Sequence, residues 1–154
     1  MDTTCGIYLI NKLNQIVLVH PTNAPKYIWS IPKGLMEKGE TYLDTAIRET
    51  FEETNIKINI NSPKIKRIME FELIKYEKTK KQLKAFALII DDDFSDITLK
   101  CTSTFKNRDG IKVPENDSVQ WYPLEYKSLP QYSHIKLHEI QEKILNILTD
   151  KLKN

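Results

Sequence analysis

Three glutamates and an arginine lie close together in one short stretch of the chain. Glu49, Glu52 and Glu53 stand at positions i, i+3 and i+4, and Arg48 directly precedes them. On a helix this spacing places the three carboxylates on one side, where each pair of like charges costs roughly 0.3 kcal/mol. A positive group is therefore expected beside them, which is either Arg48 with nearby lysines or a divalent cation.

A hard divalent cation is one chemistry that such a patch supports. Mg²⁺ prefers oxygen ligands and keeps waters and substrate phosphates in its shell, so a few carboxylates on one rigid helix face suit it. Acidic patches also occur as plain solvated helix surfaces. The spacing alone leaves both interpretations open.

The longer segment GLMEKGETYLDTAIRETFEETNI, residues 34–56, resembles the Nudix box, whose pattern is G-x5-E-x7-R-E-U-x-E-E-x-G-U with U aliphatic. The matching residues are Gly34, Glu40, Arg48, Glu49, Glu52, Glu53 and Ile56. Thr50 stands where the pattern has an aliphatic residue, and Asn55 replaces the glycine, although Asn also tolerates the left-handed conformation after a helix. The flanking runs LVHPTNAPKYIWSIPKG and VPENDSVQWYPLE are similar to a group of small Nudix hydrolases.

The resemblance implies a fold and a reaction. The fold is α+β, a mixed sheet sandwiched between helices. The reaction is attack by water on a phosphorus of a pyrophosphate link in a nucleoside diphosphate derivative, with Mg²⁺ or the substitute Mn²⁺. The implied metal ligands are Glu49, Glu52, Glu53 and the backbone carbonyl of Lys33. The implied catalytic residues are Glu52, Glu53 and Arg48, with Arg48 orienting the carboxylates. The general base is Glu52, Glu53 or a carboxylate outside the box, where Glu115 is the first candidate and Asp117 the other.

The expected substrate is less sharply defined. Lys33 belongs to a PKG run that is similar to dinucleoside polyphosphate hydrolases and to some decapping and inositol-polyphosphate enzymes. Candidate substrate contacts are Lys33, Gly34, Tyr27, Trp29 and Lys84, although strand aromatics are often core and lysine groups are often solvated turns. Dinucleoside polyphosphates such as diadenosine tetraphosphate, or nucleoside triphosphates, are expected first. The alternatives are an RNA 5′-end pyrophosphohydrolase or decapping enzyme, and a catalytically silent nucleotide sensor.

The surrounding pattern predicts the elements that would hold the glutamates in place. Thr41 and Asp44 form a capping-box-like start to a helix over residues 42–54. Leu43, Ile47 and Phe51 are expected to pack on the sheet, with Thr50 and Thr54 beside them and the three glutamates on the opposite side. Strands are predicted over residues 7–10, 16–20, 27–31, 56–60, 65–76, 83–90, 97–102 and 119–124. Residues 103–117 are polar and predict an exposed loop. Apolar residues at helical spacing predict a final helix over 135–152.

Composition sets the remaining expectations. The 154 residues fit one domain, and 23 basic against 21 acidic residues leave a net charge of +2, which favours neither nucleic acid nor a membrane surface. Cys5 and Cys101 are isolated, and no secretory start or long apolar run is present, so a cytoplasmic protein is expected. The expected partner is a small nucleotide, with an RNA 5′ end as the alternative, and the chain is expected to be a monomer or homodimer.

Overall fold

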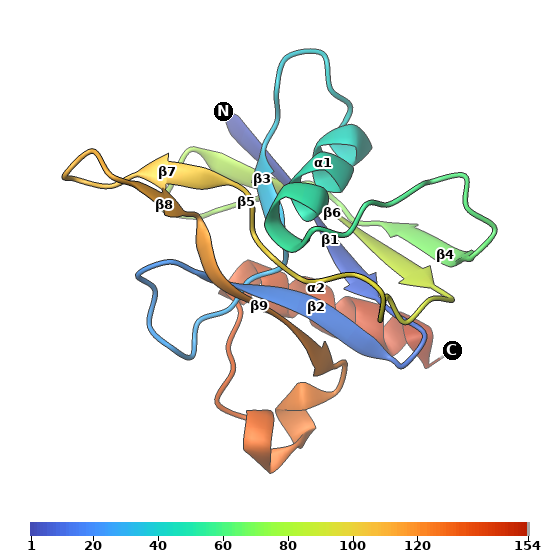
Figure 1. Cartoon of the computed structure of the whole chain (residues 1–154). Helices are drawn as coiled ribbons and strands as arrows, with labels where there is room; N and C mark the ends of the chain where they lie inside the picture. The colour runs from blue at the N-terminus through green and yellow to red at the C-terminus, as the bar shows by residue number, and fades with distance from the viewer. Residues whose placement is uncertain (154) are drawn as a thin grey trace.

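The fold is built on one mixed β-sheet, which a computed structural model describes over residues 1–153 (Figure 1). The strands of this sheet are β1 (Asp2–Ile10), β2 (Gln15–Pro21), β3 (Lys33–Leu35), β4 (Ile65–Glu70), β5 (Ile74–Lys75), β6 (Lys81–Ile90) and β9 (Asn116–Pro123). The main path runs β4-β6-β1-β2-β9, while β3 pairs with β1 and β5 pairs with β6. Only β1 and β6 are parallel among these pairs.

Two helices cover opposite faces of this sheet, α1 (Tyr42–Thr54) and α2 (Glu139–Leu152) (Figure 1). Alternate residues of β1 supply the two cores. Ile7 and Leu9 pack in the cluster that contains Ala46 of α1, whereas Tyr8 and Ile10 pack in the cluster that contains α2. The predicted α+β class, with a mixed sheet between helices, is confirmed. Within residues 1–153, no helix is long and apolar enough to cross a membrane.

The predicted helix over 42–54 is confirmed at both ends. The Thr41 hydroxyl accepts a hydrogen bond from the Asp44 N–H at 3.0 Å, and the Asp44 carboxylate accepts one from the Thr41 N–H at 3.1 Å. This capping box satisfies two backbone donors at the first turn. Asn55 ends the helix in the left-handed conformation, with φ of 73°.

Three of the predicted strands are wrong, because these segments do not form strands. Residues 27–31 form only isolated bridges, at Ile28 and Ser30, and the true strand there is the later β3. Residues 56–60 are irregular, although Ile56 and Ile58 are buried. Residues 97–102 run past the end of α1, where the N–H groups of Lys100 and Thr102 donate to carbonyls of the last helical turn. Those bonds satisfy carbonyls that a helix end leaves free.

The remaining differences concern boundaries. The predicted strand over 65–76 is split into β4 and β5, and the final helix begins at 139 because residues 135–137 are extended and bonded to Tyr27 and Trp29. The predicted loop over 103–117 contains a hairpin, β7 (Thr104–Lys106) and β8 (Lys112–Pro114), which forms a separate two-stranded sheet. Two short 3₁₀ helices, η1 (Tyr126–Ser128) and η2 (Pro130–Tyr132), precede α2.

Candidate active site

The helix α1 presents its glutamates differently from the sequence prediction. Phe51 was expected to pack on the sheet, but it is 41% exposed, so that prediction is wrong. Leu43 and Ile47 do pack against the core as expected, and Ala46 and Thr50 lie against the sheet at 0% exposure. The glutamates were expected on the opposite side of the helix, which is wrong for two of them. Glu49 and Glu53 are only 7% and 5% exposed, while Glu52 stays more open.

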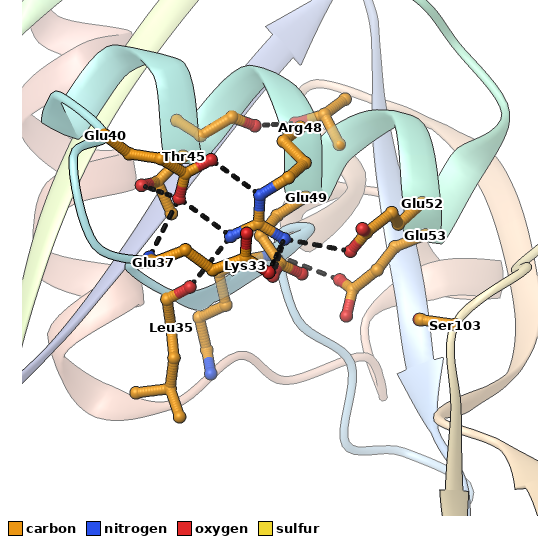
Figure 2. A network of polar contacts seen from close by, with 12 residues as sticks. Lys33, Leu35, Glu37, Glu40, Thr45, Arg48, Glu49, Glu52, Glu53 and Ser103 are labelled. Carbon is orange, nitrogen blue, oxygen red and sulfur yellow. Dashed lines mark hydrogen bonds and ion pairs between the residues drawn. The ribbon is translucent and has the colours of Figure 1, made fainter.

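Arg48 links the acidic residues into one network (Figure 2). Its Nε and Nη2 donate to the two carboxylate oxygens of Glu40 at 2.7 and 3.0 Å. Its Nη1 donates to Glu49 at 2.9 Å and to Glu52 at 3.1 Å, and Nη2 also donates to the Leu35 carbonyl. Because the guanidinium is a planar fork, it fixes these carboxylates in a way that lysine could not copy. The Arg48 hydrogen bonds lower the pKa of Glu40 to about 2.

Gly34 in β3 leaves room for Glu49. A Cβ at this position would lie 2.1 Å from the Glu49 carboxylate carbon and 2.2 and 2.4 Å from its oxygens. These distances are far below van der Waals contact, so only glycine lets the Glu49 carboxylate lie against the β3 backbone. The Gly34 of the box pattern therefore shapes the acidic site directly.

Glu53 is held by a backbone donor and influenced by a neighbouring side chain. The Lys33 N–H donates to Glu53 Oε1 at 3.0 Å, and the Asn116 side chain at the start of β9 acts to lower the pKa of the carboxylate. Burial nevertheless raises the pKa of Glu53 to about 8, and burial together with Glu52 raises the pKa of Glu49. Asn116 was not identified from the sequence, where nothing distinguishes it from other loop asparagines.

Three neighbouring cavities surround this network. The aromatic cavity, of about 330 Å³, is lined by Trp29, Tyr76 and Lys33 among others. The Glu53 cavity, also about 330 Å³, is lined by Lys33, Glu53, Phe105, Glu115 and Asn116. The Glu49 cavity, about 630 Å³, is lined by Arg48, Glu49, Glu52, residues 102–104 and Glu115. Lys33 thus joins the first cavity to the second, and Glu115 joins the second to the third.

Several of the predicted residues come together here, and two do not. Lys33, Gly34, Trp29 and Glu115 all line one or more of these cavities. Tyr27 lines none of them and is 46% exposed. Lys84 is also outside them, because its ammonium bonds the Phe71 carbonyl at 2.7 Å and Glu70 at 3.2 Å.

The residues present fit a divalent cation by the chemistry of their donors. Glu49, Glu52 and Glu53 offer hard oxygen ligands, and Arg48 Nη1 already places a positive charge between Glu49 and Glu52. In the conformation described for residues 1–153, no three His, Cys, Asp or Glu side chains converge on a single metal position. Metal binding would therefore require the carboxylates to move closer together than they lie in this conformation.

Comparison with known proteins identifies the family. A NUDIX domain model matches residues 2–142. The chain belongs to the Nudix family. The Nudix box predicted at residues 34–56 therefore runs through β3 and α1, and its two departures are accommodated locally. Thr50 is fully buried with its hydroxyl bonded to the Ala46 carbonyl, and Asn55 occupies the left-handed position after the helix.

Individual relatives support the same assignment. The Nudix chain is 42% identical over 52 residues to an RNA pyrophosphohydrolase from Pelagibacter ubique (strain HTCC1062), and this match covers 34% of the chain and 33% of that protein. Its structure resembles a C. elegans Ap4A hydrolase with a TM-score of 0.61 and 18% identity, over 99% and 98% of the two chains. It also resembles a bifunctional NMN adenylyltransferase/ADP ribose pyrophosphatase from Francisella tularensis, complexed with AMP and Mn ion, with a TM-score of 0.67 and 20% identity over 97% and 41%. These structural likenesses concern the fold.

Proposed function

We propose that this Nudix chain is a divalent-metal-dependent pyrophosphohydrolase that cleaves a phosphoric anhydride bond in a nucleotide. The observation that carries the proposal is the ridge formed by Glu49, Glu52 and Glu53, which lines the Glu49 and Glu53 cavities and in which Arg48 bonds Glu49 and Glu52. The named activities of the pyrophosphohydrolase relatives support it. We further propose that residues 1–154 act as one domain in the cytoplasm.

The proposed roles follow from what each side chain contacts. Glu49, Glu52, Glu53 and the Lys33 carbonyl would hold Mg²⁺ or Mn²⁺, which neutralises phosphate oxygens and lowers the pKa of the attacking water. Arg48 orients Glu49 and Glu52 through its hydrogen bonds.

A proton acceptor is also needed, because the attacking water must lose a proton. Glu115 is proposed for this role because it is exposed and lines both the Glu53 and the Glu49 cavities. Glu52 and Glu53 are the alternatives within the box. Asp117 is less suited, because its carboxylate bonds His20 at 2.7 Å and lines none of the three cavities.

The aromatic cavity supports a nucleoside-containing substrate. Trp29 and Tyr76 offer ring surfaces for a base, and Lys33 stands between that cavity and Glu53, where an ammonium would offset phosphate charge. Dinucleoside polyphosphates or nucleoside triphosphates are therefore the first proposed substrates. The second candidate is a 5′-phosphorylated RNA end, favoured by the 42% identity to the bacterial RNA pyrophosphohydrolase. A silent sensor is disfavoured because Arg48 and all three carboxylates are present and connected.

The test is a hydrolysis assay with Mg²⁺ or Mn²⁺ on diadenosine tetraphosphate, nucleotide sugars, nucleoside triphosphates and 5′-triphosphorylated RNA. Glu52→Gln and Glu53→Gln should each lower turnover at least about a hundredfold, because a carboxylate ligand is lost. Glu72→Gln, at an exposed position outside the network, is the matched control and should leave turnover unchanged. Heavy-oxygen water would identify the phosphorus attacked. Binding of these nucleotides without hydrolysis would instead support the sensor.

A further inference from the structure

The β7–β8 hairpin, named here the arm, is joined to the candidate active site at both of its ends. Residues 102–104 line the Glu49 cavity just before and at the start of β7, and Glu115, just after β8, lines two cavities. The arm pairs with no strand of the main sheet and projects from the body of the molecule (Figure 1). It is therefore placed to contact a part of the substrate that extends beyond the cavities.

The two faces of the arm differ in chemistry. Phe105 and Val113 are paired across the strands, and Phe105 lines the Glu53 cavity. Because strand side chains alternate, the Thr104–Pro114 and Lys106–Lys112 pairs share the other face. Thr104 lines the Glu49 cavity. The face of the arm that carries Phe105 thus adjoins the Glu53 cavity. The face that carries Lys106 and Lys112 adjoins the Glu49 cavity through Thr104.

The cationic face is costly for the arm itself. Lys106 and Lys112 are direct cross-strand partners, and like charges at such positions destabilise a hairpin. Within residues 1–153, Lys106 and Lys112 form no ion pair with an acidic side chain. The same is true of Arg108 at the turn. The two lysines therefore lower the stability of the hairpin, and together they can hold an anion.

We propose that the arm binds the 5′ region of an RNA chain whose terminal phosphates lie in the acidic site. Lys106 and Lys112, which share one face of the arm, contact backbone phosphates of the nucleotides that follow the 5′ end. The proposal rests on the proposed function and favours its RNA candidate. Lys106 lies two residues, about 7 Å of strand, beyond Thr104, and Arg108 lies farther out along the arm. RNA carries a phosphate at every nucleotide along such a path, whereas a dinucleoside polyphosphate carries all of its phosphates in one short run.

The first test measures binding without catalysis. Fluorescence anisotropy would follow a short, 5′-monophosphorylated single-stranded RNA in the absence of metal. Lys106→Thr/Lys112→Thr should weaken binding at least tenfold and reduce the slope of log Kd against log salt by about 1.4, because two phosphate contacts are lost. Lys57→Thr/Lys66→Thr removes the same charge from exposed positions that line none of the three cavities and should change Kd less than about twofold.

Lys106→Arg/Lys112→Arg should keep the affinity of the unaltered protein, and the single variant Lys112→Thr provides a milder change if the double variant fails to fold. Unchanged RNA affinity in the arm variants would overturn the proposal. Equal loss in the Lys57/Lys66 control would overturn it too, because the effect would then come from net charge alone.

The second test measures kcat/KM for 5′-triphosphorylated RNA and for ATP. The Lys106→Thr/Lys112→Thr variant should lose at least tenfold on RNA and keep its value on ATP. Equal losses on both substrates, or the same loss on diadenosine tetraphosphate as on RNA, would overturn the RNA assignment. If the unaltered protein hydrolyses none of these substrates, the proposed function fails, and the binding measurement still decides whether the arm holds RNA.

Discussion

The two helices cover opposite faces of the same sheet, yet they bury different kinds of side chain. From α2, the buried residues are Ile140, Gln141, Ile144, Leu145 and Leu148, and the one polar residue among them accepts and donates hydrogen bonds in the core. From α1, the buried residues are Thr45, Ala46, Glu49, Thr50, Glu53 and Thr54. One helix supplies hydrocarbon to the core, and the other supplies small and acidic side chains.

The buried side chains of the two helices indicate that α1, and not α2, is constrained by the chemistry of the site. Burying a carboxylate costs free energy unless donors and charges compensate. Arg48 and the Lys33 N–H compensate in part, but burial still raises the pKa of Glu49 and Glu53. Hydrophobic packing alone would not select this arrangement, so α1 carries the site at a cost in stability that α2 helps to offset. The predictions below test that division.

The largest effect on stability is expected from α2. Ile144 is fully buried, so Ile144→Ala should lower the free energy of unfolding by about 3 kcal/mol, through lost contacts and a residual cavity. Denaturant titration would measure it, and turnover of the folded protein should stay within about twofold because Ile144 lines none of the three cavities. Ile147→Ala, at a 46% exposed position, is the control. A hundredfold loss of turnover in Ile144→Ala would show that α2 is not a purely structural helix.

A large effect on activity with little effect on folding is expected at Gly34. The added methyl of Gly34→Ala would displace the end of the flexible Glu49 side chain, so the fold can adjust while the carboxylate moves. Turnover should fall about a hundredfold, equivalent to about 2.7 kcal/mol. Gly6→Ala provides the contrast, because its Cβ would lie 2.6 Å from the Pro32 carbonyl oxygen and should destabilise the fold instead. Unchanged turnover in Gly34→Ala would remove Glu49 from the proposed site.

Local signals predicted α1 well, and tertiary contacts decided what the sequence could not. The Thr41 and Asp44 cap is a short-range pattern, so it was predictable. The side on which the carboxylates lie was only partly predictable. Leu43, Ile47 and Thr50 lie on the core side as expected, but Phe51 is exposed, and Glu49 and Glu53 are buried. The resemblance to the Nudix box identified the acidic residues in spite of this error.

The site residues outside the box were only partly predictable. Glu115 was identified as a candidate, but the arm that positions it was read as a loop. The Asp109-Gly110 pair is a hairpin signal that could have revealed the arm, since Gly110 has φ of 75°. The net charge of +2 also concealed the arm, because a total says nothing about where the lysines gather. Lys84 was proposed as a substrate contact, but the pairing of β4 with β6 brings its ammonium to Glu70 and the Phe71 carbonyl, partners that its local sequence does not indicate.

A moderate effect is expected from pH. The pKa of Glu53 is raised to about 8, so between about pH 5 and about pH 8 the folded, metal-free protein binds more protons than the unfolded chain. Its free energy of unfolding should therefore fall by a few kcal/mol as pH rises through this range. Thermal unfolding in chelator would measure this fall, and Glu53→Gln should largely remove it. Added Mg²⁺ should stabilise the protein more at pH 8, because metal binding displaces the proton. A pH-independent Tm would contradict the burial of Glu53 as an acid.

The smallest effect is expected where α1 ends. Asn55 is left-handed, which favours glycine, but its side chain also donates to the Thr98 carbonyl at 3.0 Å. Asn55→Gly relieves the backbone and loses that bond, so the free energy of unfolding should change by less than about 0.5 kcal/mol. Asn55→Ala is the sharper variant, because it loses the bond and keeps a Cβ in the left-handed region, and it should cost about 1 kcal/mol. Both should retain full turnover, since Asn55 lies past the last carboxylate, and a loss of turnover in Asn55→Gly would mean that the helix end, and not only its acidic ridge, is part of the site.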